Sequence, residues 1–259
     1  YAVPVLSASA EQKIKDLYKL FLQHGIIGVR NLEYMYGRKT HPNLINKFIV
    51  SSEREKSIVR DELYYPEEDI AVTGLARFDS LLKDNGFFES YKVRKKVLIM
   101  PSWRMGQEKL SDEDFTETTF YKAFHSLINN PRLEKLVMDK GITIDLYLHN
   151  NFQKYNHLFT SDFVNIIKAS DTTVQTLLKE HGILITDFSS VGLDFAIQRR
   201  PVLYYQFDVE LKEKRAEESS KNFLPGKIFQ IEDDLINEIE QKIKRYRMDK
   251  EFKKLIPEK

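Results

Sequence analysis

The segment Ile183–Asp194, which reads Ile-Leu-Ile-Thr-Asp-Phe-Ser-Ser-Val-Gly-Leu-Asp, combines residue types that can bind an anion. It predicts a short buried strand, a polar turn and a helix beginning near Val191. A helix N-terminus offers unpaired backbone N–H groups and the positive end of the helix dipole, so it binds phosphate without a cationic side chain. Ser189 and Ser190 add hydroxyl donors, but Asp187 and Ser189 are also ordinary N-cap residues. These residues alone leave both a capped helix and a phosphate site open.

Three other predicted strand ends also carry polar residues. Arg77 follows one strand in Gly-Leu-Ala-Arg-Phe-Asp, Arg104 follows another in Pro-Ser-Trp-Arg, and His149 follows a third. Ligands of open α/β sheets bind beyond the carboxyl ends of the strands, so these side chains indicate a polar cleft for a phosphorylated ligand. Local alternatives stay open, since Arg77 could pair with Asp79 in its own turn and His149 could be an ordinary edge histidine.

Composition narrows the class of protein. The chain has 259 residues, 42% of them hydrophobic, which is enough for a sizeable core in one large or two modest domains. A net charge of +1 gives no argument for a nucleic-acid partner, and the absence of cysteine excludes disulfides and thiolate chemistry. No apolar run is long enough to span a bilayer. The phosphate loop, the Gly-x-Gly-x-x-Gly pattern, the serine-hydrolase elbow and the His-Glu-x-x-His metal helix are all missing.

The first part of the chain shows alternating strand and helix patterns. We expect a helix over 11–23, a strand from Phe48 entering a capped helix over 56–63, a strand over 70–74 and a turn over 75–79. This alternation is typical of a parallel sheet.

A polar segment over 83–96, with the turn signal Asn85-Gly86, is the expected linker. Beyond it, β/α alternation predicts a doubly wound sheet. The expected strands cover 96–100, 142–148, 164–168, 183–185 and 201–205; the expected helices cover 119–128, 132–140, 173–180, 191–197 and 233–247; and 108–117 is an acidic loop. The predicted domains are therefore 1–84 and 85–259.

The histidines differ in context. His24 stands at the end of a predicted helix beside Gly25. Glycine permits a close backbone approach, but a His-Gly pair is also common where a helix ends. The remaining histidines, His41, His125, His157 and His181, are expected at the surface.

Several of these segments, in order, resemble the CDP-glycerol glycerophosphotransferases, the teichoic acid and capsule polymerases and primases. The matching segments are Gln23-His-Gly, Val72-Thr-Gly-Leu-Ala-Arg-Phe-Asp79, Leu98-Ile-Met-Pro-Ser-Trp-Arg104, Leu146-Tyr-Leu-His149, Leu184 to Asp194, and Arg200-Pro-Val-Leu-Tyr-Tyr205. Two departures stand out. Asn150 replaces the family's usual proline after the second histidine, and the charged region 208–223 replaces a glycine-containing loop.

The resemblance implies a GT-B-like α/β fold, with a doubly wound Rossmann-like C-terminal domain preceded by a partial N-terminal α/β domain. It also implies transfer of a polyol phosphate from CDP-glycerol or CDP-ribitol to a hydroxyl of a cell-wall or capsule polymer, with release of CMP. By this resemblance, His24 is the expected base and His149 stabilises phosphate or shares that role. Donor phosphates are expected at Arg77, Arg104, Asp187, Ser189, Ser190 and Asp194. Metal dependence cannot be read from the sequence.

The expected acceptor is a lipid-linked polymer at the cytoplasmic face of the membrane, and no nucleic-acid partner is expected. The basic end, from Lys242 to Arg247 and Lys253-Lys254, could touch anionic headgroups or be a solvated helix. Two other hypotheses remain open at this point. One is a GT-B sugar transferase that uses a nucleotide-sugar donor, and the other is a non-catalytic domain that binds nucleotide or polymer within a larger synthase.

Overall fold

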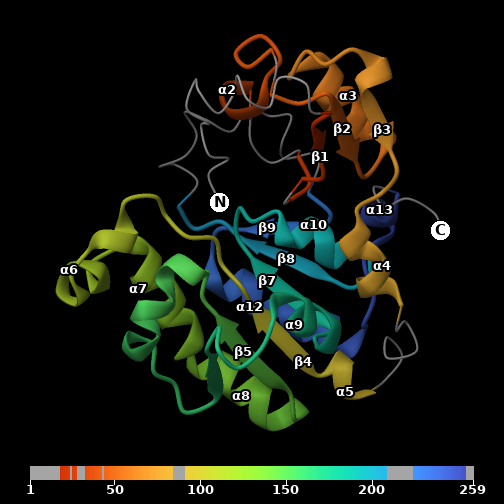
Figure 1. Cartoon of the computed structure of the whole chain (residues 1–259). Helices are drawn as coiled ribbons and strands as arrows, with labels where there is room; N and C mark the ends of the chain where they lie inside the picture. Colours follow the sequence, from red (N-terminus) through yellow and green to blue (C-terminus); the bar gives the residue numbers. More distant parts are fainter. Residues whose placement is uncertain are drawn as a thin grey trace. The chain divides into compact units, whose positions relative to one another are not determined.

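The computed structural model describes residues 18–23, 25–27, 33–42, 44–83, 91–208 and 224–254. Figure 1 labels their helices and strands. The chain divides into two compact units, Tyr1–Ala76 and Arg77–Lys259, so the division falls earlier than the boundary expected at residue 84. Helix α4 (Ala76–Leu82) begins at this division, and the turn expected over 75–79 is wrong because these residues enter that helix.

The first unit contains a parallel sheet with the strand order β1-β2-β3. Its elements are β1 (Leu20–Phe21), α2 (Glu33–Tyr36), β2 (Lys47–Val50), α3 (Glu53–Asp61), η1 (Glu67–Asp69) and β3 (Ile70–Val72). The expected capped helix is confirmed, since the Ser52 side chain accepts the N–H of Glu55 at the start of α3. The helix expected to run to Gln23 is wrong at its end, where Leu20 and Phe21 pair with β2. Residues 11–17 of that helix lie outside the described residues.

The second unit confirms the doubly wound sheet. Its strands are β4 (Lys96–Ile99), β5 (Thr143–Tyr147), β6 (Val164–Ile167), β7 (Ile183–Thr186), β8 (Val202–Tyr205) and β9 (Lys227–Phe229). They are all parallel, in the order β6-β5-β4-β7-β8-β9. This is the strand order of the dinucleotide-binding Rossmann fold.

Helices cover both faces of this sheet (Figure 1). The helices of this part of the chain are α5 (Tyr91–Arg94), α6 (Asp112–Thr116), α7 (Thr119–Ile128), α8 (Pro131–Lys140), α9 (Val174–Glu180), α10 (Val191–Ala196), α12 (Glu232–Lys244) and α13 (Lys250–Lys253), with 3-10 helices η3 (Gln107–Lys109) and η4 (Asn150–Leu158). The acidic stretch expected as a loop thus contains η3 and α6. Neither η4 nor β9 was expected from the sequence.

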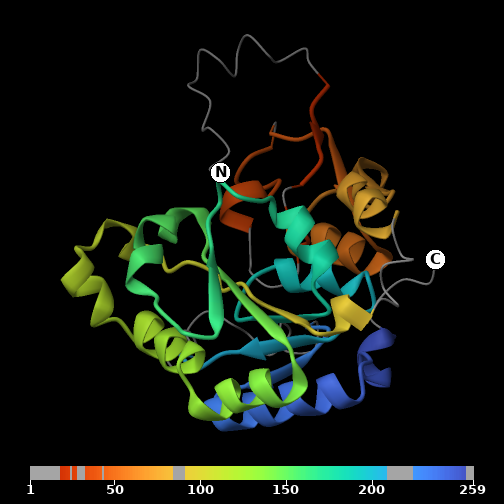
Figure 2. The same cartoon turned by 90° about the horizontal axis from the view of Figure 1, so that it is seen from below.

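One hydrophobic cluster of the second unit covers one face of the sheet. Val97 and Ile99 of β4 are fully buried there, together with apolar residues of α7, α8 and α12. Figure 2 shows α8 and α12 side by side beneath the sheet, and the two helices are in contact. Leu98, between the two, is also fully buried, as expected for a strand covered on both faces. Among the described residues, no helix combines the length and apolar character needed to cross a membrane.

Candidate functional site

Two loops meet where the strand order of the six-stranded sheet reverses. The sheet extends from β4 to β6 in one direction and from β7 to β9 in the other, so the reversal lies between β4 and β7. Open α/β sheets bind ligands at the carboxyl ends of the strands at such a point. Here the segment 100–106 follows β4 and the turn 187–190 follows β7. The Thr186 hydroxyl donates to the carbonyl of Met100 at 2.7 Å, which joins the two loops at their base.

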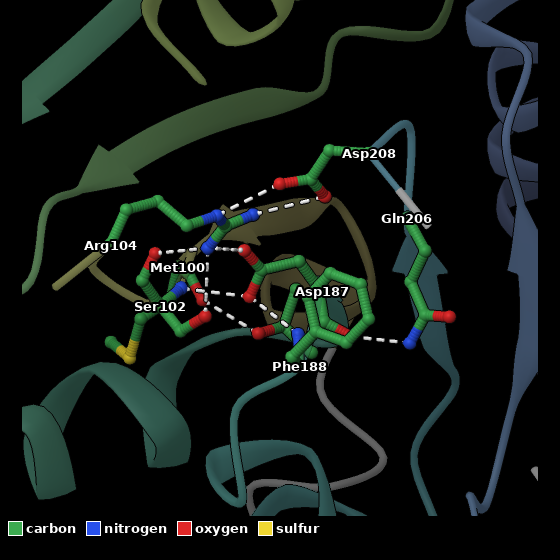
Figure 3. Close-up of polar contacts among 8 residues, drawn as sticks. Met100, Ser102, Arg104, Asp187, Phe188, Gln206 and Asp208 are labelled. Atoms are coloured by element: carbon green, nitrogen blue, oxygen red, sulfur yellow. Dashed lines mark hydrogen bonds and ion pairs between the residues drawn. The ribbon is translucent and has the colours of Figure 1, made fainter. Parts of the chain in front are cut away.

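Asp187 organises both loops from a fully buried position (Figure 3). Its Oδ1 accepts the backbone N–H of Ser102 at 2.8 Å and that of Phe188 at 2.6 Å. Its Oδ2 accepts Nη1 of Arg104 at 2.8 Å. On the other side, the Gln206 amide donates to the backbone carbonyl of Asp187 at 2.9 Å. The turn after β7 is therefore bonded to the loops after β4 and β8.

The guanidinium of Arg104 is occupied by partners inside the protein. Nε and Nη2 donate to the two carboxylate oxygens of Asp208 at 2.9 and 3.3 Å, and Nη1 also donates to Ser102. The side chain is only 9% exposed and lies near the rings of Phe120, Phe188 and Phe207. Burial alone would lower the pKa of Arg104, but the two carboxylates raise it, so the group is charged. Because Nη2 carries one further hydrogen beyond its bond to Asp208, direct contact of Arg104 with phosphate, as expected from the sequence, stays a prediction.

Arg77 and Asp194 pair with each other. Nε and Nη2 of Arg77 donate to Oδ2 and Oδ1 of Asp194 at 2.8 and 2.9 Å. The local pair of Arg77 with Asp79, which the sequence left open, is not formed. Burial raises the pKa of Asp194, and the bonds from Arg77 oppose this shift. The Nη1 group of Arg77 has no hydrogen-bond partner in the part of the chain that the structure describes.

The predicted turn and helix after β7 are confirmed as the segment leading into α10. Ser190 is the N-cap residue, and its side chain makes no capping bond, whereas the Ser189 hydroxyl accepts the N–H of Val191 at 3.3 Å. Within the described ranges, the backbone N–H groups of Ser189 and Ser190 have no acceptor. Two successive free N–H groups at a turn are an arrangement suited to an anion.

His149 lies at the carboxyl end of β5, beside β4. Its ring stacks on Trp103 with the centroids 5.9 Å apart, and its Nδ1 accepts the N–H of Asn151 at 3.2 Å. Partial desolvation of the ring lowers the pKa of His149. Asn150, which replaces the family's proline, is the first residue of η4 and accepts the Tyr147 hydroxyl at 3.2 Å. Because the first helical position tolerates either residue, this departure preserves the turn that holds His149.

His24 lies outside the described residues, so its expected catalytic role stays a prediction. No three His, Asp or Glu side chains converge as metal ligands within the described part of the chain.

Two residues at the end of β8 were not identified from the sequence. Gln206 and Asp208 follow this strand and hold Asp187 and Arg104 respectively. The segment Tyr205-Gln-Phe-Asp shows the pattern of the other strand ends, because polar residues directly follow an apolar strand. Asp208 is also the first residue of the charged region 208–223, which hides this pattern.

Two surface assignments need correction. His181 is not at the surface but 1% exposed, because its ring lies between Asp145 and the carbonyl of Leu177. Lys242 is not part of an exposed basic face either. Its side chain is 7% exposed and pairs with Glu238 and Asp249.

The parallel strand order and the polar loops at its reversal define the second unit as a Rossmann-like α/β domain. The sequence model of one family, described as CDP-Glycerol:Poly(glycerophosphate) glycerophosphotransferase, matches residues 9–256. Because the match covers nearly the whole chain, the protein belongs to this family.

Several proteins of teichoic acid synthesis are similar to this chain. The chain is 29% identical to the minor teichoic acid biosynthesis protein GgaB of Bacillus subtilis (strain 168), over 75% of this chain and 22% of that protein. It is 28% identical to the teichoic acid ribitol-phosphate primase of Bacillus spizizenii, over 71% of this chain and 43% of the relative. The chain thus spans less than half the length of these relatives. Its fold resembles that of the wall teichoic acid polymerase TagF with a TM-score of 0.61 and 19% identity, covering 84% of this chain and 55% of that one.

Proposed function

We propose that this chain transfers glycerol phosphate or ribitol phosphate from a CDP-activated donor to a hydroxyl of a cell-wall polymer and releases CMP. Family membership supports the reaction type. The similarity to a ribitol-phosphate primase and to a wall teichoic acid polymerase supports the polymeric acceptor. The observation that carries the proposal is that the N–H groups of Ser189 and Ser190 have no acceptor among the described residues, at the point where an open α/β sheet binds its ligand.

The donor pyrophosphate needs hydrogen-bond donors and positive potential. The N–H groups of Ser189 and Ser190 and the Ser190 hydroxyl supply neutral donors. Arg77 supplies charge through Nη1, because its other donor edge is held by Asp194. In this arrangement Asp187, Arg104 and Asp194 shape the site, and the serines and Arg77 contact the donor.

In the reaction, the acceptor oxygen forms a bond to the β-phosphorus while the bond from this phosphorus to the bridging oxygen breaks. CMP leaves with that oxygen, and the hydroxyl proton passes to a base. His24 is the proposed base, and His149 stabilises the transferring phosphoryl group. Phosphoryl transfer depends mostly on positioning and charge stabilisation, so a dispersed set of donors suits it.

The proposed acceptor is lipid-linked, which places the reaction at the inner face of the membrane. The buried ion pairs of Lys242 leave Lys244, Arg245, Arg247, Lys253 and Lys254 as the basic residues for any contact with headgroups.

The proposal is tested by thermal stabilisation and calorimetry with CDP-glycerol, CDP-ribitol, CMP and UDP-sugars. A CDP-polyol should stabilise the protein. Stabilisation by UDP-sugars alone would favour a sugar transferase, and no response to any cytidine nucleotide would contradict the proposal.

Two variants at position 190 distinguish the contribution of the backbone N–H from that of the side chain. Ser190 has φ of −64°, which proline adopts, and its N–H has no partner among the described residues. Ser190→Pro therefore removes the proposed phosphate donor without breaking a bond, whereas Ser190→Ala retains it. We expect weaker donor binding by Ser190→Pro, which loses both the N–H and the hydroxyl, than by Ser190→Ala, which loses the hydroxyl alone, with folding of both checked by circular dichroism.

A further inference from the structure

We infer that Asp208, at the end of β8, is a positioning residue for the donor site, acting through Arg104 and Asp187 on the turn 187–190. The inference rests on the proposed function, because it concerns the geometry of the same site. Asp208 is 9% exposed and reaches the turn only through Arg104 in this network (Figure 3).

The first step is the orientation of the guanidinium. Asp208 accepts two hydrogen bonds from Arg104, from Nε at 2.9 Å and from Nη2 at 3.3 Å. A two-point contact fixes the plane of the group as well as its place. With this plane fixed, Nη1 points to Oδ2 of Asp187 at 2.8 Å.

The second step is the direction of the backbone N–H groups in the turn. Asp187, held by Arg104, accepts the N–H of Phe188 at 2.6 Å. The N–H groups of Ser189 and Ser190 are then the ones without acceptors among the described residues. If Asp187 were released, the Phe188 N–H would lose its buried acceptor and the turn would no longer have to present the next two groups to a ligand.

The charge of this network distinguishes positioning from simple electrostatics. Two buried carboxylates face one guanidinium, so Asp187, Arg104 and Asp208 together carry a net negative charge. Neutralising Asp208 removes a negative charge near the proposed phosphate site, and this effect alone would strengthen the binding of an anionic donor. Loss of positioning would weaken it. The two explanations therefore predict opposite signs.

The test compares Asp208→Asn with Asp233→Asn in the full chain. Asp233 makes an exposed ion pair with Arg132 in the same unit, so its substitution is a matched control. We expect Asp208→Asn to raise the dissociation constant of CDP-glycerol on the order of tenfold, the effect of losing one charged hydrogen bond, with the control unchanged. Affinity that is unchanged or increased in Asp208→Asn would overturn the inference.

Amide hydrogen exchange reports on the turn without a ligand. Exchange at Phe188, whose N–H donates to Asp187, should be faster in Asp208→Asn, while the strands β4 and β5 remain protected as in the wild type. If wild-type protein bound no CDP-polyol, the proposed function would fail; unchanged exchange in the turn would overturn the positioning role separately. Gln206→Met, which removes the bond to the backbone carbonyl of Asp187, provides a second variant with the same expected direction should Asp208→Asn not fold.

Discussion

Arg77 and Asp194, 117 residues apart, form a bidentate ion pair with N–O distances of 2.8 and 2.9 Å. The pair connects α4, which begins at the division between the two units, to α10, which follows the proposed donor turn. The side chain of Asp194 is 14% exposed, and Arg77 is its ion-pair partner among the described residues.

Substitution of Arg77 by lysine should lower the free energy of unfolding by about 2 kcal/mol, because lysine cannot form two parallel bonds to a largely buried carboxylate. Urea denaturation measures this change. Arg132→Lys, in the exposed pair with Asp233, is the control and should cost less than about 0.5 kcal/mol. Equal losses in both variants would show that the Arg77 pair is no stronger than a surface pair.

The sequence predicted most of the second unit, because apolar runs bounded by turn residues correspond closely to its strands. It also identified three of the strand ends that form the site. It could not predict partners, since the pairing of Arg104 with Asp208 depends on which strand ends are neighbours in the sheet. Arg77 shows the same limit, because local spacing suggested Asp79 and the fold supplies Asp194.

Two other errors, one in each unit, have a similar cause. The apolar run Leu20–Leu22 fits a helix or a strand equally well, and pairing with β2 decides in favour of a strand. His181 looked like a surface residue because it follows the polar end of a helix, but Asp145 from β5 provides a buried partner for its ring.

Gly192 packs directly against the ring of Tyr204. A Cβ at this position would lie 2.3 Å from the Tyr204 hydroxyl, which is buried and has no hydrogen-bond partner among the described residues. Gly192→Ala should therefore destabilise the protein by about 2 kcal/mol. Tyr204→Phe should relieve much of this loss in the double variant, because it removes the atom in closest contact. A double-mutant cycle by thermal denaturation tests the coupling, and additive effects would contradict it.

Asp145 should make the free energy of unfolding depend on pH. Burial alone would raise the pKa of Asp145, but hydrogen bonds from His181 and Asn165 outweigh it and lower the pKa. The unfolded chain then binds a proton at higher pH than the folded protein does. The stabilisation is complete above the unfolded value of about 4 and is lost as the pH falls through the lower folded value.

Urea denaturation between pH 3 and pH 7 checks this dependence. The wild type should lose stability more steeply below about pH 4 than Asp145→Asn does. Asp233→Asn, at an exposed aspartate, should follow the wild-type curve. Parallel curves for the wild type and Asp145→Asn would exclude Asp145 as the source of the acid sensitivity.

His149 should be neutral at pH 7 and carry its proton on Nε2. Desolvation lowers its pKa from the ordinary value, so the charged form is lost before neutral pH is reached. The N–H of Asn151 donates to Nδ1 at 3.2 Å, which requires a lone pair on Nδ1 and leaves the proton on Nε2. A neutral ring of this form donates a hydrogen bond through Nε2 and does not accept a proton there, which suits phosphate stabilisation and leaves the base role to His24. Long-range ¹H–¹⁵N correlation spectra recorded across the titration measure both properties. A midpoint above about 6.5, or a proton on Nδ1, would return His149 to the role of a base.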